Sequence, residues 1–159
     1  MILVNHNQLF GFYTGNDAYG YHSGEDAVPG HFTIDLGVTT QLTKCKLHFR
    51  DPNNFSGNNP TQLEMWGRPN LEDAETLPVF QSIGNTVVSD PVSTESFENS
   101  GWQLLADQSI DGGGLQNIEF DLPNGPFSRY IRLRYTSTVG NEAFQLIEVE
   151  FSGYGAITD

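Results

Sequence analysis

The sequence predicts an all-β fold, an antiparallel β-sandwich or jelly roll of about eight strands. Apolar and polar residues alternate with period two in one run after another, and no segment keeps a 3.6-residue period. The 17 glycines and 8 prolines fall largely between these runs and punctuate the chain. Such alternation is typical of antiparallel strands that bury one face, and many short strands separated by turns are typical of sandwiches and jelly rolls.

Six runs are predicted as strands because their apolar residues occupy every second position. In chain order they are Phe32–Leu36, Lys44–Arg50, Leu63–Trp66, Ile118–Leu122, Ile131–Tyr135 and Ile147–Phe151. Gly37 is expected to close the first run. Weaker runs at Val79–Val88 and Trp102–Asp107 bring the count to about eight, and the best helical segment is one short turn, Leu71–Leu77. The residues predicted to face the core are Phe32, Ile34, Leu36, Leu47, Phe49, Ile131, Leu133, Ile147, Val149 and Phe151.

The length of 159 residues fits a single domain, residues 1–159, and we expect that domain to be excised from a larger protein. The longest irregular stretch, residues 67–101, is acidic and too long for an ordinary connection. It is therefore predicted to be an insertion that is functional or contains small elements of its own. The single cysteine, Cys45, lies on the apolar side of its strand and is predicted to be a buried free thiol.

The charge of the chain limits its partners. Twenty acidic and seven basic residues give a formal net charge of −13, which repels nucleic acid and anionic membrane surfaces. No run approaches the roughly 18 apolar residues of a membrane span, and the first thirty residues lack a basic region followed by an apolar one. The sequence therefore predicts no nucleic-acid partner and no membrane insertion, and leaves neutral or cationic ligands.

Catalytic motifs are absent from the sequence. It contains no Gly-x-Ser-x-Gly elbow, phosphate loop, Cys-x-x-Cys or His-Glu-x-x-His. The most enzyme-like feature is Glu148 with Glu150, which share one face of a predicted strand as the paired carboxylates of sandwich-fold glycosidases do. Arg132 and Arg134 lie on the outward face of the preceding predicted strand, so ordinary cross-strand ion pairs explain the two glutamates better. The prediction is a non-enzyme, with a glycosidase as the less favoured alternative.

Two predicted loop regions carry side chains suited to a sugar. Residues 12–30 are rich in tyrosine, glycine and histidine, and residues 51–60 are rich in asparagine and follow Arg50. Amide groups offer a donor and an acceptor together, which matches a hydroxyl, and aromatic rings cover the apolar face of a sugar. The same exposed aromatic residues would also suit a protein-interaction patch.

Six motifs in a fixed order resemble a known family. They are Pro29–Gly37 (PGHFTIDLG), Lys46–Arg50 (KLHFR), Leu63–Gly67 (LEMWG), Gly101–Leu105 (GWQLL), Arg129–Leu133 (RYIRL) and Ile147–Gly153 (IEVEFSG). The set, spread over residues 12–153, resembles the discoidin family of coagulation-factor type C domains, which have a galactose-binding-like jelly roll. Family 32 carbohydrate-binding modules and the discoidin-like domains of bacterial glycan-utilisation surface proteins are the most similar in character. His31 departs from the tryptophan usual in the first motif.

The resemblance implies a non-catalytic carbohydrate-binding module that is exported and lies at the cell surface or outside the cell. Its partners would be a neutral, galactose-type glycan and neighbouring domains of a larger chain. The ligand-binding residues it implies are Tyr21, His22, Arg50, Asn54, Phe55, Asn58 and Trp66. Trp66 points outward from its strand, so it is either covered by the insertion or exposed as a platform. The alternative is a protein-interaction or spacer module of a surface protein.

The resemblance also implies a structural calcium site, although no cofactor is required. In the family this ion is held by an early turn and a late glutamate. The family's aspartate in that turn is replaced here, in Thr14-Gly15-Asn16, so the expected ligands are Asn16, Asp17 and Glu148. Losing a carboxylate weakens a calcium site because this hard cation prefers charged oxygen ligands.

Overall fold

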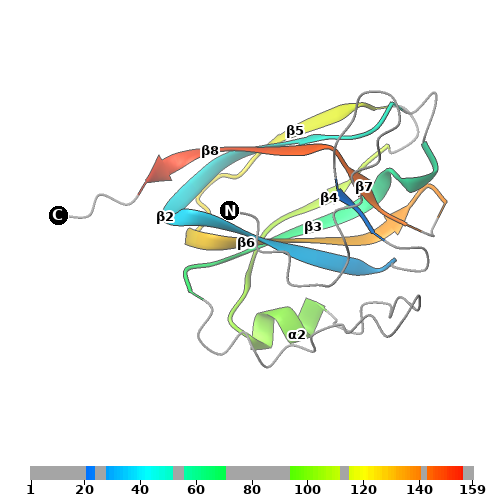
Figure 1. Cartoon of the computed structure of the whole chain (residues 1–159). Coiled ribbons are helices and arrows are strands. Elements are labelled where there is room, and N and C mark those ends of the chain that lie inside the picture. The colour runs from blue at the N-terminus through cyan, green and yellow to red at the C-terminus, as the bar shows by residue number, and fades with distance from the viewer. Residues whose placement is uncertain are drawn as a thin grey trace.

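The computed structural model describes residues 21–23, 28–51, 56–70, 94–111, 115–140 and 143–155. In chain order its elements are β1 (Tyr21–His22), β2 (Gly30–His48), the 3₁₀ helix η1 (Ser56–Asn58), β3 (Pro60–Arg68), α2 (Thr94–Asn99), β4 (Gln103–Ser109), β5 (Asn117–Asp121), β6 (Phe127–Thr138), β7 (Gln145–Leu146) and β8 (Glu148–Gly155). The predicted all-β sandwich is confirmed within these residues (Figure 1). The predicted elements at 71–77 and 79–88 lie outside them.

One long strand, β2, belongs to both layers of the sandwich. Its first part pairs with β6, and its second part pairs with β5 on one side and β8 on the other. Figure 1 shows β2 running along the lower layer, bending at one end of the molecule and returning in the upper layer. The remaining strands extend the lower layer in the order β6, β3, β4. A separate two-stranded sheet, β1 with β7, lies at the end of the sandwich.

The bend in β2 lies at Gly37, which was expected to end a strand. The register between β2 and β6 shifts between Asp35 and Thr40, and Gly37 has a φ of +76°, a backbone conformation that favours glycine. The buried Asp35 carboxylate accepts a hydrogen bond from the Gly37 N–H at 2.8 Å. It also accepts two from the Arg129 guanidinium, at 2.8 and 2.9 Å. The alternation of apolar and polar residues correctly predicts strand on both sides of Gly37, but the strand bends there and continues instead of ending.

This corner should make the stability of the fold depend on acidity. The hydrogen bond from Arg129 is the main reason that the pKa of Asp35 falls from 3.8 to about 2. A carboxyl whose pKa is lower in the folded state stabilises the fold above its unfolded pKa, and this contribution is lost as the pH falls from about 4 to about 2. We expect Asp35→Asn to cost about 1–3 kcal/mol at neutral pH. Urea unfolding of both proteins should show the difference shrinking over that window, and a difference independent of pH would contradict it.

The main core lies between the two layers and confirms the predicted inward face. Six of the ten predicted core residues are buried: Phe32, Ile34, Leu47, Phe49, Ile131 and Leu133. Leu36, Val149 and Phe151 are partly buried and pack against this cluster, while Ile147 is half-buried. Cys45 is fully buried as predicted, and burial raises the pKa of its thiol to about 12, so it carries no reactive thiolate at neutral pH.

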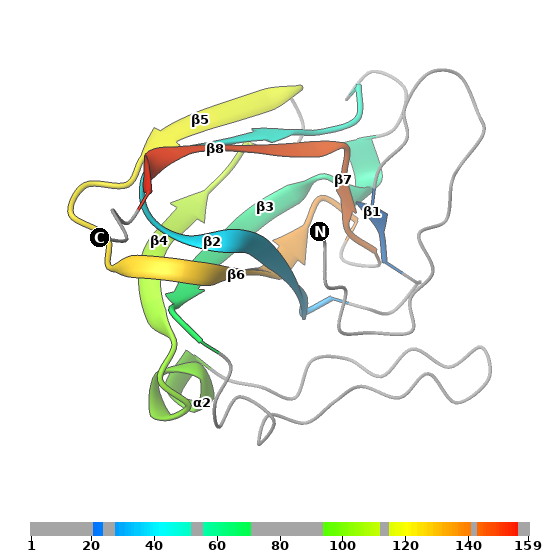
Figure 2. The same ribbon diagram turned by 60° about the vertical axis from the view of Figure 1, so that its left-hand side comes forward.

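A second, smaller core lies on the outer side of the lower layer, beneath α2. It consists of Trp66, Phe97 and Trp102, all of which are buried. Phe97 comes from α2, which Figure 2 shows below the sheet, and its ring lies 5.4 Å from that of Trp66. The guanidinium of Arg132 stacks over Trp102 at 4.2 Å. The described end of the insertion at 67–101 therefore covers apolar surface of the sheet.

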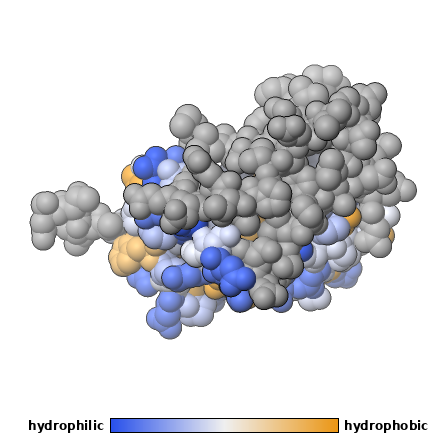
Figure 3. Space-filling model, turned by 90° about the horizontal axis from the view of Figure 1, so that it is seen from below, coloured by the Kyte–Doolittle hydropathy of each residue, from blue (hydrophilic) through white to orange (hydrophobic). Residues whose placement is uncertain are grey.

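The surface on the α2 side is mostly polar among the described residues. Figure 3, which views the molecule from below, shows mainly hydrophilic colours there, with hydrophobic colour in a few small areas. No helix in the described ranges is both long enough and apolar enough to cross a membrane.

Candidate functional site

Several loops meet at the end of the sandwich where β2 ends and β3 begins. The N–H of Val139 donates to the carbonyl of Asn59 at 3.0 Å, and the N–H of Gly140 donates to the carbonyl of Gly57 at 2.5 Å. A Cβ atom at Gly140 would lie 2.9 Å from that carbonyl oxygen, so only glycine allows the two loops to approach this closely. These backbone contacts fix η1 against the loop that follows β6.

Arg50 is held in place at this end of the sandwich. It directly follows the buried Phe49, and its carbonyl accepts a hydrogen bond of 3.1 Å from the amide of Asn59. Its guanidinium donates from Nη1 to Oε1 of Gln145 at 3.3 Å. The side chain is half-buried, so its planar set of N–H donors is fixed at the surface rather than free in solvent.

The short strand β1 lies beside the same glutamine. Tyr21 pairs with Leu146, and His22 pairs with Gln145. Gln145 thus touches Arg50 through its side chain and His22 through its backbone. The sequence had placed Tyr21 and His22 at the same end of the sandwich as Arg50, and their backbones lie there; their side chains are not among the described parts.

The asparagine-rich loop is described only in part. Asn58 lies in η1 and is half-buried, whereas Asn54 and Phe55 lie outside the described residues. Asn59 and Gln145 are both buried and position Arg50. Asn59 belongs to the asparagine-rich loop that the sequence indicates for sugar binding, whereas Gln145 was missed by sequence reasoning. A signal existed for Gln145: it is a single polar residue inside the apolar run 143–147.

The structure removes Trp66 from the candidate ligand-binding residues. Its side chain is 0% exposed, packs against Phe97 and donates from Nε1 to Glu64 at 3.0 Å. A fully buried ring has no face open to a sugar. Of the two expectations for Trp66, the one in which the insertion covers it is correct, because the ring points away from the main core and α2 packs over it.

Glu148 and Glu150 do not face Arg132 and Arg134, contrary to the prediction. Strand β8 pairs with β2, which sets Glu148 opposite His48 and Glu150 opposite Lys46. The two arginines lie in β6, between β2 and β3, and Arg134 pairs with Glu64 instead. The prediction assumed that strands adjacent in sequence pair with each other, and β2 occupies that place.

The surroundings of Glu150 do not suit an acid catalyst. Glu150 accepts a hydrogen bond from His48 and lies 3.7 Å from the ammonium of Lys46. The hydrogen bond from His48 and the charge of Lys46 lower the pKa of Glu150. A general acid of a glycosidase needs a raised pKa so that it is protonated near neutral pH.

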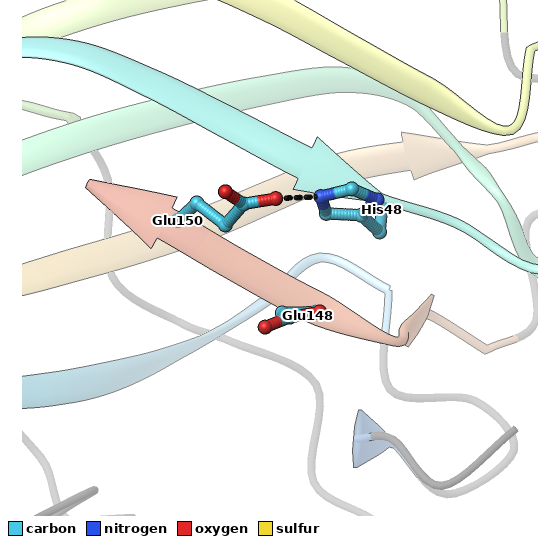
Figure 4. Close-up of side chains that lie close together, drawn as sticks. All are labelled: His48, Glu148 and Glu150. Atoms are coloured by element: carbon cyan, nitrogen blue, oxygen red, sulfur yellow. Dashed lines mark hydrogen bonds and ion pairs between the residues drawn. The ribbon is translucent and has the colours of Figure 1, made fainter. Parts of the chain in front are cut away.

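Only one of the three predicted calcium ligands can be placed. Glu148 is exposed on β8, and Asn16 and Asp17 lie outside the described residues. The carboxylate of Glu148 lies near the imidazole of His48 and the carboxylate of Glu150 (Figure 4). Calcium takes oxygen ligands, so this neighbourhood offers one ligand atom of the wrong type. The calcium site therefore stays a prediction.

Solved structures of low sequence identity share this fold. A SusE-like protein aligns with 98% of this chain at 18% identity and a TM-score of 0.64, and the chain spans 63% of that protein's length. A family 32 carbohydrate-binding module, CBM32-3 of a family 31 glycoside hydrolase from Clostridium perfringens, aligns with 89% of this chain and 80% of its own, at 16% identity and a TM-score of 0.61. The C-terminal domain of a chitobiase from Bacteroides fragilis aligns with 96% of this chain and 84% of its own, at 15% identity and a TM-score of 0.59.

These likenesses show that the fold is the discoidin-like β-sandwich expected from the six motifs. Among curated protein sequences, none matches the chain. A family profile matches residues 12–155, nearly the whole chain. The chain therefore belongs to the DUF5000 family, which is described as a domain of unknown function.

Proposed function

We propose that this protein is a non-catalytic carbohydrate-binding module that holds a neutral glycan at the end of the sandwich around Arg50. The observation that carries the proposal is the meeting of three segments at Gln145. The Arg50 guanidinium reaches its side chain, and β1, which carries Tyr21 and His22, pairs with its backbone. Structures similar to this fold include carbohydrate-binding modules and a lectin domain, which supports the assignment to glycan binding.

The residue types at this end suit an uncharged sugar. A guanidinium donates to ring hydroxyls without needing a negative partner, and the amide of Asn58 can both donate and accept. The tyrosine and histidine of β1 supply the ring types that cover the apolar face of a pyranose. The net charge of −13 works against an anionic ligand such as a phospholipid head group. The ligand we propose is therefore a neutral glycan, and we take the galactose type from the resemblance to family 32 modules.

The biological setting follows from the same proposal. Residues 1–159 would form one domain of a larger, exported protein that presents the site at the cell surface or outside the cell. The SusE-like protein, of which this chain spans 63%, and the modules borne by glycoside hydrolases support this arrangement. The lowered pKa of Glu150 argues against this residue as the general acid of a glycosidase.

A glycan array followed by calorimetry tests the proposal. We expect the protein to retain neutral glycans with terminal galactose-type sugars and not sulfated or sialylated analogues, and to bind the retained glycan without cleaving it. Calorimetry of the best glycan should give a stoichiometry of one. An array without binding would favour the alternative of a protein-interaction or spacer module, and turnover of the captured glycan would favour a glycosidase.

A further inference from the structure

We propose that His48, Glu148 and Glu150 form a binding site for a zinc-type divalent cation on the outer face of the upper layer. The site joins the end of β2 to β8; it is distinct from the glycan site and shares only Glu148 with the predicted calcium site. One potential ligand atom from each residue lies within 4.8 Å of the other two. Figure 4 shows the imidazole and the two carboxylates gathered where the two strands run antiparallel.

The strand register explains why these three side chains are together. His48 lies directly opposite Glu148 in the ladder, and Glu150 lies two residues further along β8, opposite Lys46. Residues two apart on a strand project from the same face, and a diagonal cross-strand neighbour remains within reach of long side chains. The backbone thus fixes the positions of all three Cα atoms, and a metal ion would need to order only side chains.

The donor set suits zinc better than calcium. Zinc in proteins is bound by imidazole nitrogen and carboxylate oxygen at about 2.0–2.2 Å, often by three protein ligands and a water molecule. Ligand atoms around such an ion lie roughly 3.3–3.6 Å apart. The exposed side chains of Glu148 and Glu150 can close the difference from the present separation by rotation about their side-chain bonds. Calcium and magnesium require oxygen ligands, and imidazole favours zinc, copper and nickel.

The negative charges of Glu148 and Glu150 are only partly neutralised by the side chains around them. Glu150 is engaged by His48 and by Lys46, at 3.7 Å from the ammonium. Within the described part of the chain, the carboxylate of Glu148 makes no hydrogen bond or ion pair. Lys46 therefore pairs with only one of the two carboxylates, and a divalent cation bound between them would neutralise the other. Further along the same face, Lys44 already pairs with Glu119 at 2.6 Å, so that carboxylate is satisfied without a metal.

Zinc titration of the full chain, followed by calorimetry, tests the site. We expect wild-type protein to bind one zinc ion per chain and to melt at a higher temperature in its presence, because a ligand of the native state stabilises it. His48→Gln and Glu148→Gln should each weaken zinc binding at least about tenfold, since even loss of an outer-shell partner costs about 10–100-fold. Lys46→Gln should strengthen binding, because Lys46 competes with the metal for Glu150.

The matched control is Glu119→Gln, which removes a carboxylate from the same outer face without touching the trio. It should bind zinc as wild type does. The proposal is overturned if wild-type protein fails to bind zinc at millimolar concentration, if the His48 and Glu148 variants bind as tightly as wild type, or if the Glu119 control weakens binding equally. Circular dichroism checks that each variant is folded, and Glu150→Gln replaces any variant that is not. Calcium added at the same concentration as zinc should not displace the zinc. Displacement would overturn the proposal and assign Glu148 to the calcium site instead.

Discussion

Replacing Arg50 with alanine is expected to weaken glycan binding about 10- to 150-fold while the domain stays folded. The guanidinium is held at the surface by its hydrogen bond to Gln145, so it can donate to sugar hydroxyls without being reorganised. Losing a charged hydrogen-bond partner costs about 1.5–3 kcal/mol, which corresponds to this change in affinity. Calorimetry on the glycan selected from the array would measure it directly.

Two further variants separate the hydrogen-bonding role of Arg50 from its charge. Arg50→Lys keeps the positive charge but lacks the planar set of donors, so its affinity should fall between those of wild type and Arg50→Ala. Lys44→Ala removes a positive charge from β2 six residues before Arg50, where Lys44 pairs with Glu119 of β5, and should bind as wild type does. Equal glycan affinity in wild type and Arg50→Ala would move the site away from this end of the sandwich.

Replacing Leu133 with alanine is expected to lower the free energy of unfolding by about 2–5 kcal/mol. Leu133 is 0% exposed at the centre of the lower layer, where it pairs with Phe32 of β2 on one side and Met65 of β3 on the other. Truncation removes buried apolar surface and leaves a cavity that β-strands fixed on both sides cannot easily fill. Chemical unfolding monitored by tryptophan fluorescence would report the change, since Trp66 and Trp102 are both buried.

Leu104 provides the control for this experiment. It is 46% exposed on β4, so the same substitution should change the stability by no more than about 0.5 kcal/mol. If Leu133→Ala were as mild as Leu104→Ala, the assignment of the inward face of β6 would be wrong. If both substitutions lowered the stability by several kcal/mol, the Leu104 side chain would have to be buried, contrary to its exposure in the structure.

The alternation of apolar and polar residues was sufficient to predict most of the core. Period two is a local property, because successive side chains of a strand point to opposite faces whatever the strand pairs with. Ile131 and Leu133 could therefore be assigned to the interior without knowing that β6 lies between β2 and β3. The same reasoning placed Lys46 and His48 on the outer face, where the structure has them in contact with Glu150.

Strand pairing could not be predicted in the same way. The sequence suggested that the β8 glutamates face the arginines of β6, but β8 pairs with the second half of β2. A glycine after an alternating run predicts a strand end, but the positive φ of Gly37 bends β2 into the second layer. A bend and an end have the same local composition. They are distinguished by the pairing of the residues that follow Gly37, from Thr40 to His48, with the distant strands β5 and β8.

The class of the fold, the inward face of most strands and the position of Arg50 near a strand end can all be read from the order of the amino acids. These properties depend on the spacing of neighbouring residues. Three contacts are visible only in the folded chain: Phe97 covers Trp66, Gln145 joins Arg50 to β1, and His48 meets Glu148 and Glu150. Each of these contacts joins segments at least about 30 residues apart, and their meeting depends on which strands pair and on what the long insertion covers. Those choices are set by the burial of the whole chain and not by any local pattern.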